Sequence, residues 1–80
     1  MTQVTVLYFA SLRDAAGCAS ETIETSDSTL RALYASLSFR HRFVLPADRL
    51  RVAVDGAFED WDDAPREGSE IAFIPPVSGG

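Results

Sequence analysis

The longest apolar runs of the chain lie near its two ends. Residues 4–9 are rich in β-branched and aromatic side chains over the length of a strand, which predicts a strand buried on both faces or nearly so. Residues 70–74 predict a second apolar strand, which Pro75 and Pro76 end because proline cannot continue a ladder of backbone hydrogen bonds. Residues 20–25 alternate polar side chains around Ile23, which predicts an edge strand protected by its charges.

Helical spacing marks the middle of the chain. Asp27, Ser28 and Thr29 are all competent N-caps for a helix that begins just after them. Its buried face repeats at i, i+3, i+4 and i+7 in Leu30, Leu33, Tyr34 and Leu37. A shorter helical segment is predicted over residues 11–17, with Ser11 as its cap and Gly17 in the left-handed conformation that ends it.

The second half of the chain predicts three strands joined by turns. Residues 39–48 have no clear period and are expected to form a connection with at most a turn of helix. Residues 50–55 alternate as a strand, Asp55-Gly56 favours a two-residue hairpin, and a short return strand is expected around Phe58. Residues 67–69 close the loop before the last strand.

This element order predicts an α+β fold. A mixed β-sheet that packs on one main helix is a β-grasp, or ubiquitin-like, roll. The first and last strands are expected to lie side by side and parallel at its centre, with the helix in the crossover between them. We therefore predict one β-grasp domain over residues 1–74 and a flexible Gly-Gly tail over residues 75–80.

Strand parity predicts two different faces of the sheet. Eight apolar side chains can cover the helix: Val4, Val6, Tyr8, Leu50, Val52, Val54, Ile71 and Phe73. The opposite face receives Leu7, Phe9, Ala53, Ala72 and Ile74, joined by Phe58. Little chain is left to cover this second face, which favours docking of a partner. The alternative is that the loop 39–48 folds over it with its own apolar side chains.

The last six residues are Pro75, Pro76, Val77, Ser78, Gly79 and Gly80. Such a segment favours an extended conformation and can reach roughly 20 Å beyond the sheet. A terminal Gly-Gly carries its carboxylate on a chain thin enough to enter a narrow channel. The alternative is an ordinary frayed terminus.

Composition and charge narrow the classes of function. Eighty residues support one small core. The formal net charge of −5, with seven arginines and no lysine, disfavours nucleic-acid binding, which needs a basic face. No run of the sequence is long enough to span a membrane, and the start of the chain does not resemble a signal peptide. A single cysteine indicates a reducing, cytoplasmic location.

The chain shows no self-contained active site. Cys18 has no second cysteine or histidine at catalytic spacing, so we expect an inert thiol. His41, which lies between two arginines, is a poor metal ligand, and no metal site is expected. The acidic run 59–63 is expected to be a solvated loop with Trp61 folded onto the core; electrostatic steering is the alternative. Two interpretations are open for four arginines, a local basic patch or solubility alone: Arg40, Arg42, Arg49 and Arg51.

Three segments carry a resemblance to a known family. They are residues 70–80 (EIAFIPPVSGG), 6–13 (VLYFASLR) and 53–56 (AVDG), and the first of these is the most specific. Together they make the chain similar to the ubiquitin-like sulfur carriers that form the small subunit of molybdopterin synthase. The similarity spans the whole chain.

The resemblance implies a cycle in which this chain is both substrate and carrier. An adenylyltransferase related to ubiquitin activators would use ATP to adenylate the Gly80 carboxylate, and a sulfur donor protein would convert the adenylate to a thiocarboxylate. Gly79 and Gly80 would enter the active site of the large synthase subunit and donate sulfur to cyclic pyranopterin monophosphate. No cofactor would bind to this chain itself.

The resemblance also assigns a docking surface. The apolar docking residues of the family fall on Phe9, Phe58 and Ile74, and the segment 75–78 would contact the same partner. Two other functions remain open: sulfur carriage for thiamine or tRNA thiolation, and conjugation of Gly80 to lysines of other proteins.

Overall fold

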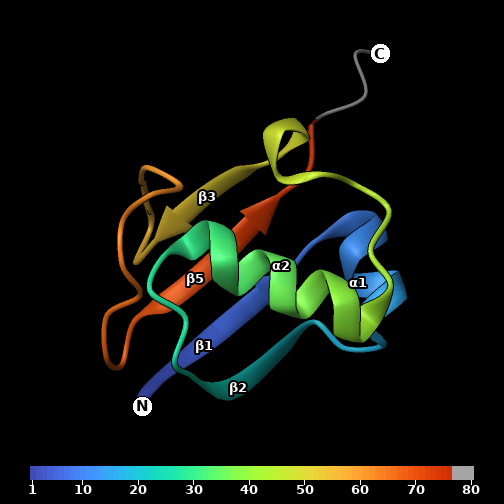
Figure 1. The fold of residues 1–80 in the computed structure, drawn as a ribbon. Helices are drawn as coiled ribbons and strands as arrows, with labels where there is room; N and C mark the ends of the chain where they lie inside the picture. Colours follow the sequence, from blue (N-terminus) through green and yellow to red (C-terminus); the bar gives the residue numbers. More distant parts are fainter. Residues whose placement is uncertain (77–80) are drawn as a thin grey trace.

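The computed structural model describes residues 1–76 as a five-stranded mixed sheet with two α-helices (Figure 1). The strands are β1 (Thr2–Tyr8), β2 (Ser20–Thr25), β3 (Arg51–Val54), β4 (Ala57–Phe58) and β5 (Glu70–Ile74). The helices are α1 (Ala10–Ala16), α2 (Leu30–His41) and the 3₁₀ turn η1 (Ala47–Arg49). Strand order is β2-β1-β5-β3-β4, with β1 and β5 parallel at the centre. This is the predicted β-grasp roll.

Helix α2 lies across one face of the sheet, and its predicted stripe forms the core (Figure 1). All four stripe residues are buried, and so are the eight strand side chains that parity assigned to this face. The prediction that residues 4–9 are buried on both faces is wrong, because Thr5 and Leu7 on the opposite face are partly exposed and Phe9 is exposed. Strand β1 is therefore buried on its helix side only.

At the start of α2, backbone amides that have no partner within the helix donate hydrogen bonds to a side chain and to a loop. The hydroxyl of Thr29 accepts a hydrogen bond from the Ala32 amide at 3.0 Å. The amides of Leu30 and Arg31 donate to the carbonyls of Asp63 and Trp61 at 2.8 and 2.9 Å. The acidic run thus supplies acceptors to a helix start, where negative charge is also favourable.

Trp61 in that run folds back onto the core, as expected. Its ring stacks on Phe73 with centroids 5.8 Å apart and meets Tyr34 edge-on at 5.8 Å. The loop 59–63 is therefore a structural part of the helix side of the sheet.

Two boundaries differ from the sequence prediction. Helix α1 begins one residue before Ser11, its N-cap is Phe9 without a side-chain cap bond, and Ser11 lies inside the helix. Gly17 ends α1 in the left-handed conformation, as predicted. Helix α2 continues to His41, four residues past its last buried residue, so part of the expected connection is helical.

The loop after α2 stays on the helix side of the sheet. The ring of Phe43 stacks on Tyr34 at 5.8 Å and meets Tyr8 edge-on at 5.6 Å. The Tyr34 hydroxyl donates to the Leu45 carbonyl at 2.5 Å. The alternative in which this loop covers the opposite face is therefore wrong, and that face stays open. Within residues 1–76, no helix is both long enough and apolar enough to cross a bilayer.

Candidate functional site

The open face of the sheet carries a continuous row of neighbouring residues. Strand register places Leu7 beside Ser20 on one side and beside Ala72 on the other. Ala72 pairs with Ala53, and Ala53 pairs with Phe58 on the edge strand β4. Because directly paired residues point to the same side of a sheet, this row brings together one side chain from each of the five strands.

The open face is polar at one end and apolar at the other. Two registers away from Leu7, Thr5 pairs with Thr22 and with Glu70, and the two threonine hydroxyls lie 3.4 Å apart. The apolar row lies toward the carboxyl ends of β1 and β5. Those are the ends from which Phe9 and Pro75 continue the chain, so the apolar half of the face and the start of the tail share one end of the molecule (Figure 1).

The three predicted docking residues all lie at this end. Phe9 is 45% exposed directly after β1, and Phe58 is 57% exposed on β4. Ile74 is half-buried as the last residue of β5. Solvent therefore reaches apolar side chains that a second protein could cover.

Arg51 also belongs to this surface, which the sequence interpretation missed. It pairs with Ile74 across β3 and β5, and its guanidinium carbon lies 3.8 Å from the centroid of the Phe58 ring. Its parity with Ala53 is the signal that could have placed it on the open face rather than in the basic patch. A cation held over an aromatic ring gives an otherwise apolar surface one positive group.

The described chain ends just past β5. Pro75 is half-buried and Pro76 is exposed. The predicted site residues Val77, Ser78, Gly79 and Gly80 lie outside the described residues.

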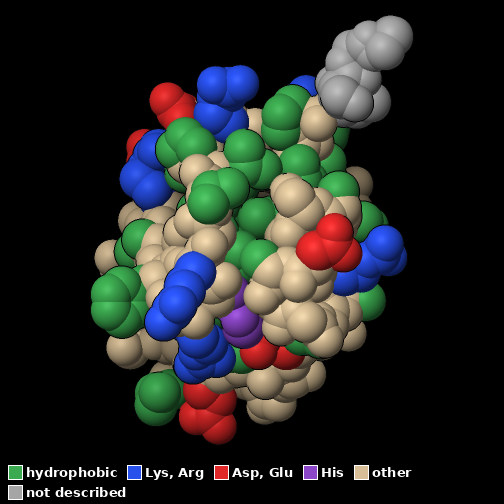
Figure 2. Space-filling model, turned by 90° about the vertical axis from the view of Figure 1, so that its right-hand side faces the viewer, with side chains coloured by type: hydrophobic (Ala, Val, Ile, Leu, Met, Phe, Trp, Pro, Cys, Tyr) green, Lys and Arg blue, Asp and Glu red, His purple; other side chains and the backbone are tan. Residues whose placement is uncertain are grey.

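A cluster of titratable side chains lies on the helix side, at the end of α2. The Tyr8 hydroxyl donates a hydrogen bond to Glu21, whose other contacts are His41 at 2.7 Å and Arg40 at 3.8 Å. Figure 2 shows the histidine recessed between carboxylate and arginine side chains. The sequence predicted Tyr8 only as a core side chain and did not single out Glu21, since both are distant from His41 along the chain.

Burial and hydrogen bonding shift two pKa values in this cluster. Burial, assisted by the nearby Glu21 carboxylate, raises the pKa of Tyr8 far above its usual range. Burial also opposes ionisation of Glu21, but hydrogen bonds from Tyr8 and His41 and the charge of Arg40 outweigh it and lower the pKa of Glu21. Tyr8 therefore stays neutral and Glu21 charged, which suits a structural lock better than proton transfer at neutral pH.

Cys18 is a free, half-buried thiol packed beside the core. Among residues 1–76, no group of three or more His, Cys, Asp or Glu side chains is placed to hold a metal ion.

Comparison with known proteins decides the family. The model of the ThiS family matches residues 6–80. The chain belongs to the ThiS family. Among its relatives, the molybdopterin synthase sulfur carrier subunit of Escherichia coli (strain K12) is 32% identical over 80 residues, which cover 96% of this chain and 99% of that protein.

Solved structures extend the comparison of this ThiS-family chain. A putative molybdopterin converting factor, subunit 1, from Pyrococcus furiosus is 29% identical with a TM-score of 0.81, covering 96% of this chain and 100% of that one. SAMP1 from Haloferax volcanii is 26% identical with a TM-score of 0.79, covering 98% and 99%. The complex of subunits 1 and 2 of molybdopterin-converting factor from Helicobacter pylori, at 19% identity, a TM-score of 0.65 and coverage of 99% and 100%, shares the fold.

Proposed function

We propose that this ThiS-family chain is the sulfur carrier subunit of a molybdopterin synthase. The observation that carries the proposal is the shared end of the molecule, where the apolar half of the open face meets the start of the Pro75–Gly80 segment. The relative from Escherichia coli that bears this name supports it. The folded body would grip a partner while the last residues deliver sulfur into the active site of that partner.

The chemistry takes place at the Gly80 carboxylate. A carboxylate is a poor electrophile, so its oxygen first attacks the α-phosphorus of ATP and pyrophosphate leaves. The resulting acyl-adenylate has AMP as a good leaving group, which a sulfur nucleophile replaces to give a thiocarboxylate. An adenylyltransferase related to ubiquitin activators supplies the ATP site, and this chain itself binds no cofactor.

The second stage takes place in the large synthase subunit. The terminal sulfur attacks cyclic pyranopterin monophosphate there, and two rounds build the dithiolene of molybdopterin. Docking raises the effective concentration of the tail at the pterin, because the reaction then occurs within one complex. The Helicobacter pylori complex of subunits 1 and 2 supports an assembly of this kind. The cytoplasmic location inferred from the cysteine content remains an expectation.

Intact-mass spectrometry tests the proposal. The chain is incubated with ATP, the activating enzyme and a sulfur source, and we expect the C-terminal residue to exchange one oxygen for sulfur. The thiocarboxylated chain, mixed with the large subunit, should then convert cyclic pyranopterin monophosphate to molybdopterin. A chain that never acquires sulfur under these conditions would contradict the proposal.

A second candidate is conjugation to other proteins. The likeness to SAMP1, the small archaeal modifier protein 1 of Haloferax volcanii, favours it. It predicts Gly80 joined to lysine side chains in digests of cellular proteins. Carriage of sulfur for thiamine or for tRNA thiolation differs from the main proposal only in the acceptor of the sulfur. Identifying the product that receives sulfur from the thiocarboxylate distinguishes these functions.

A further inference from the structure

The arginines of this acidic chain are unevenly distributed. Residues 30–51 hold five of the seven arginines and only one of the twelve carboxylates, Asp48, although the formal net charge of the whole chain is −5. Arg31 and Arg40 have acidic neighbours, Asp62 and Glu21. Arg42 and Arg49 are exposed and take part in none of the ion pairs among residues 1–76. The end of α2 and the loop after it are therefore basic.

The same region exposes two large apolar side chains. Phe39 on α2 and Val44 in the following loop are each 90% exposed, more than any other large apolar side chain in residues 1–76. Neither belongs to the core. Side chains of this size are costly to leave in water, and they lie next to unpaired positive charge.

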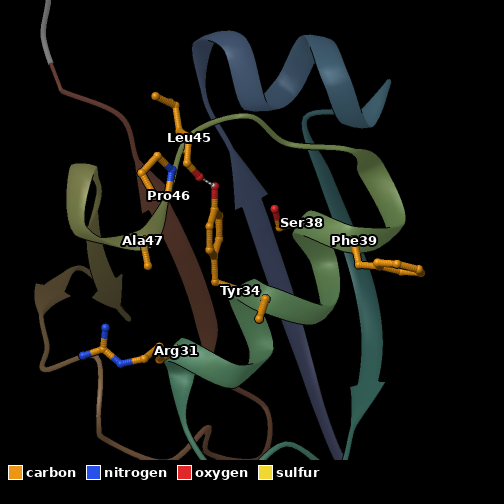
Figure 3. A pocket seen from close by; sticks show the side chains of 8 residues that line it. Arg31, Tyr34, Ser38, Phe39, Leu45, Pro46 and Ala47 are labelled. Carbon is orange, nitrogen blue, oxygen red and sulfur yellow. Dashed lines mark hydrogen bonds between the residues drawn. The ribbon is translucent and has the colours of Figure 1, made fainter.

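An apolar groove adjoins Phe39 (Figure 3). It is open to solvent, has a volume of about 410 Å³, and lies between α2 and the segment 45–47. Tyr34 forms its floor and holds the far wall through the hydrogen bond to Leu45, so the groove is built into the fold. Arg42 and Val44 lie in the chain between its two walls, and Arg49 ends η1, which starts at the lining residue Ala47. We call the groove together with Phe39, Arg42, Val44 and Arg49 the helix-side surface.

The helix-side surface lies on the opposite side of the sheet from the open face. Helix α2 packs on the side chains of Val6, Tyr8 and Phe73, whereas Leu7, Ala72 and Phe58 point the other way. A partner on the open face therefore leaves the helix-side surface free. The segment 45–47, which forms one wall of the groove, is still near the end of β5, because η1 leads directly into β3 and Arg51 of β3 pairs with Ile74 (Figure 1).

The chemistry of the proposed function, on which this inference rests, calls for two proteins at once. An acyl-adenylate is hydrolysed by water, so the activating enzyme must keep the tail enclosed until sulfur arrives. Because the tail starts beside the apolar half of the open face, an activating enzyme that encloses the tail also covers that end of the molecule, and the sulfur donor must reach Gly80 past it. It needs a second surface of the carrier.

We propose that the helix-side surface docks the sulfur donor protein, through an acidic patch on the donor that carries an apolar side chain. The donor's carboxylates face Arg42 and Arg49, and its apolar side chain enters the groove beside Phe39. Complementary charge steers the encounter and speeds association, an effect that salt weakens. Docking of the donor on the helix-side surface does not block binding of the large synthase subunit, which uses the open face.

The test compares a protein donor with an inorganic one. In the first arm, the chain, ATP and purified activating enzyme receive sodium sulfide; hydrosulfide attacks the acyl carbon, the new C–S bond forms and AMP leaves. In the second arm, sulfide is replaced by a desalted extract of source cells that lack this gene, with L-cysteine and NADPH. There the terminal sulfur of a protein-bound persulfide attacks the same carbon and AMP leaves. A dithiol of the extract then reduces the resulting acyl disulfide to the thiocarboxylate and the donor thiol, and is itself oxidised to a disulfide. Thiocarboxylate is followed by intact mass in both arms.

The variants change only exposed side chains. We expect Arg42→Asp/Arg49→Asp and Phe39→Ser to slow thiocarboxylate formation about tenfold or more with the extract at low salt, and to leave the sulfide arm unchanged. Asp is chosen at position 42 because Arg42 has a φ of 60°, which Asp tolerates. The control Arg13→Asp/Arg66→Asp makes the same charge change outside the surface and should behave as the parent in both arms.

Each other outcome overturns the inference. Equal rates for parent and variants in both arms would show that the surface has no role. Equal slowing in both arms would assign the surface to the activating enzyme instead of the donor. If the parent chain forms no thiocarboxylate even with sulfide, the proposed function itself fails, and the inference fails with it.

Discussion

At the scale of single residues, the group around Glu21 shows how contacts remote in sequence fix the end of α2. Glu21 on β2 accepts from Tyr8 on β1 and contacts His41 at the last turn of α2. The rings of Tyr8 and His41 also meet edge-on at 5.7 Å. One half-buried carboxylate thus connects an edge strand to the central strand and to the helix. Replacing Glu21 therefore tests how much its charge contributes to stability.

We predict that Glu21→Gln lowers the free energy of unfolding by about 1 kcal/mol at pH 7. The folded state lowers the pKa of Glu21 below its ordinary value near 4.5, so the unfolded chain binds more protons in that range. The stabilisation is therefore complete above about pH 4.5 and is lost as the pH falls through the lowered folded-state pKa. Urea unfolding of both proteins between pH 7 and pH 3 measures this. A difference that stays constant over the whole range would contradict the assignment.

A second residue-scale prediction concerns the open face. Ile74→Arg should prevent binding of the large synthase subunit, because the new charge would be buried without a partner at the centre of the contact. We expect a loss of about 2 kcal/mol or more, roughly thirtyfold in Kd, by isothermal titration calorimetry. Phe39→Arg on the helix side is the matched control and should bind as the parent does. Undiminished binding by the Ile74 variant would remove the open face from the interface.

At the scale of elements, the hydrophobic period predicted which residues of the helix and strands are buried but did not predict where the helices begin and end. The stripe from Leu30 to Leu37 is confirmed, because burial imposes its period on the sequence. In β3, pairing with Ala72 and Phe58 places Ala53 on the open face as predicted, but its small side chain is buried there, so burial does not alternate along this strand. The continuation of α2 to His41 was missed since its last turn exposes Phe39, and exposed turns carry no period. Ser11 looked like a cap, but the chain enters α1 through Phe9 and Ala10, whose φ of 52° is a local feature that composition does not signal.

The start of α2 gives an element-scale prediction. Thr29→Ala removes the acceptor for the Ala32 amide and should lower the free energy of unfolding by about 1 kcal/mol. The carbonyls of Trp61 and Asp63 still satisfy two other amides, so the helix should shorten little and the fold should persist. Denaturant unfolding followed by circular dichroism checks both statements. Ser28→Ala is the control and should have little effect, since Thr29 rather than its neighbours is the observed cap.

At the scale of the whole molecule, the sequence predicted the two faces of the sheet and the tail, but not the groove of the helix-side surface. Parity along the strands was sufficient to expect Phe9 and Ile74 on the open face, and the strand register places Ile74 and Phe58 there. The groove beside Tyr34 could not be predicted, because it depends on how the segment after α2 turns back, and the hydrogen bond from Tyr34 to Leu45 decides that. A surface formed by a loop can be located only from the three-dimensional structure, whereas the face to which a strand residue points can be predicted from its position in the alternating sequence.

The division between body and tail leads to the last prediction. A chain that lacks Gly79 and Gly80 should unfold at the same denaturant concentration as the parent, because β5 completes the core and, within residues 1–76, no core residue lies beyond Phe73. It should also bind the large subunit to within a few-fold, since the open face is intact. Yet it should form no thiocarboxylate and support no sulfur transfer, since its new C-terminal carboxylate lies two residues short of the catalytic centres. Activity of the truncated chain at the parent level would mean that the tail does not deliver the sulfur, whereas loss of folding would mean that the tail belongs to the body.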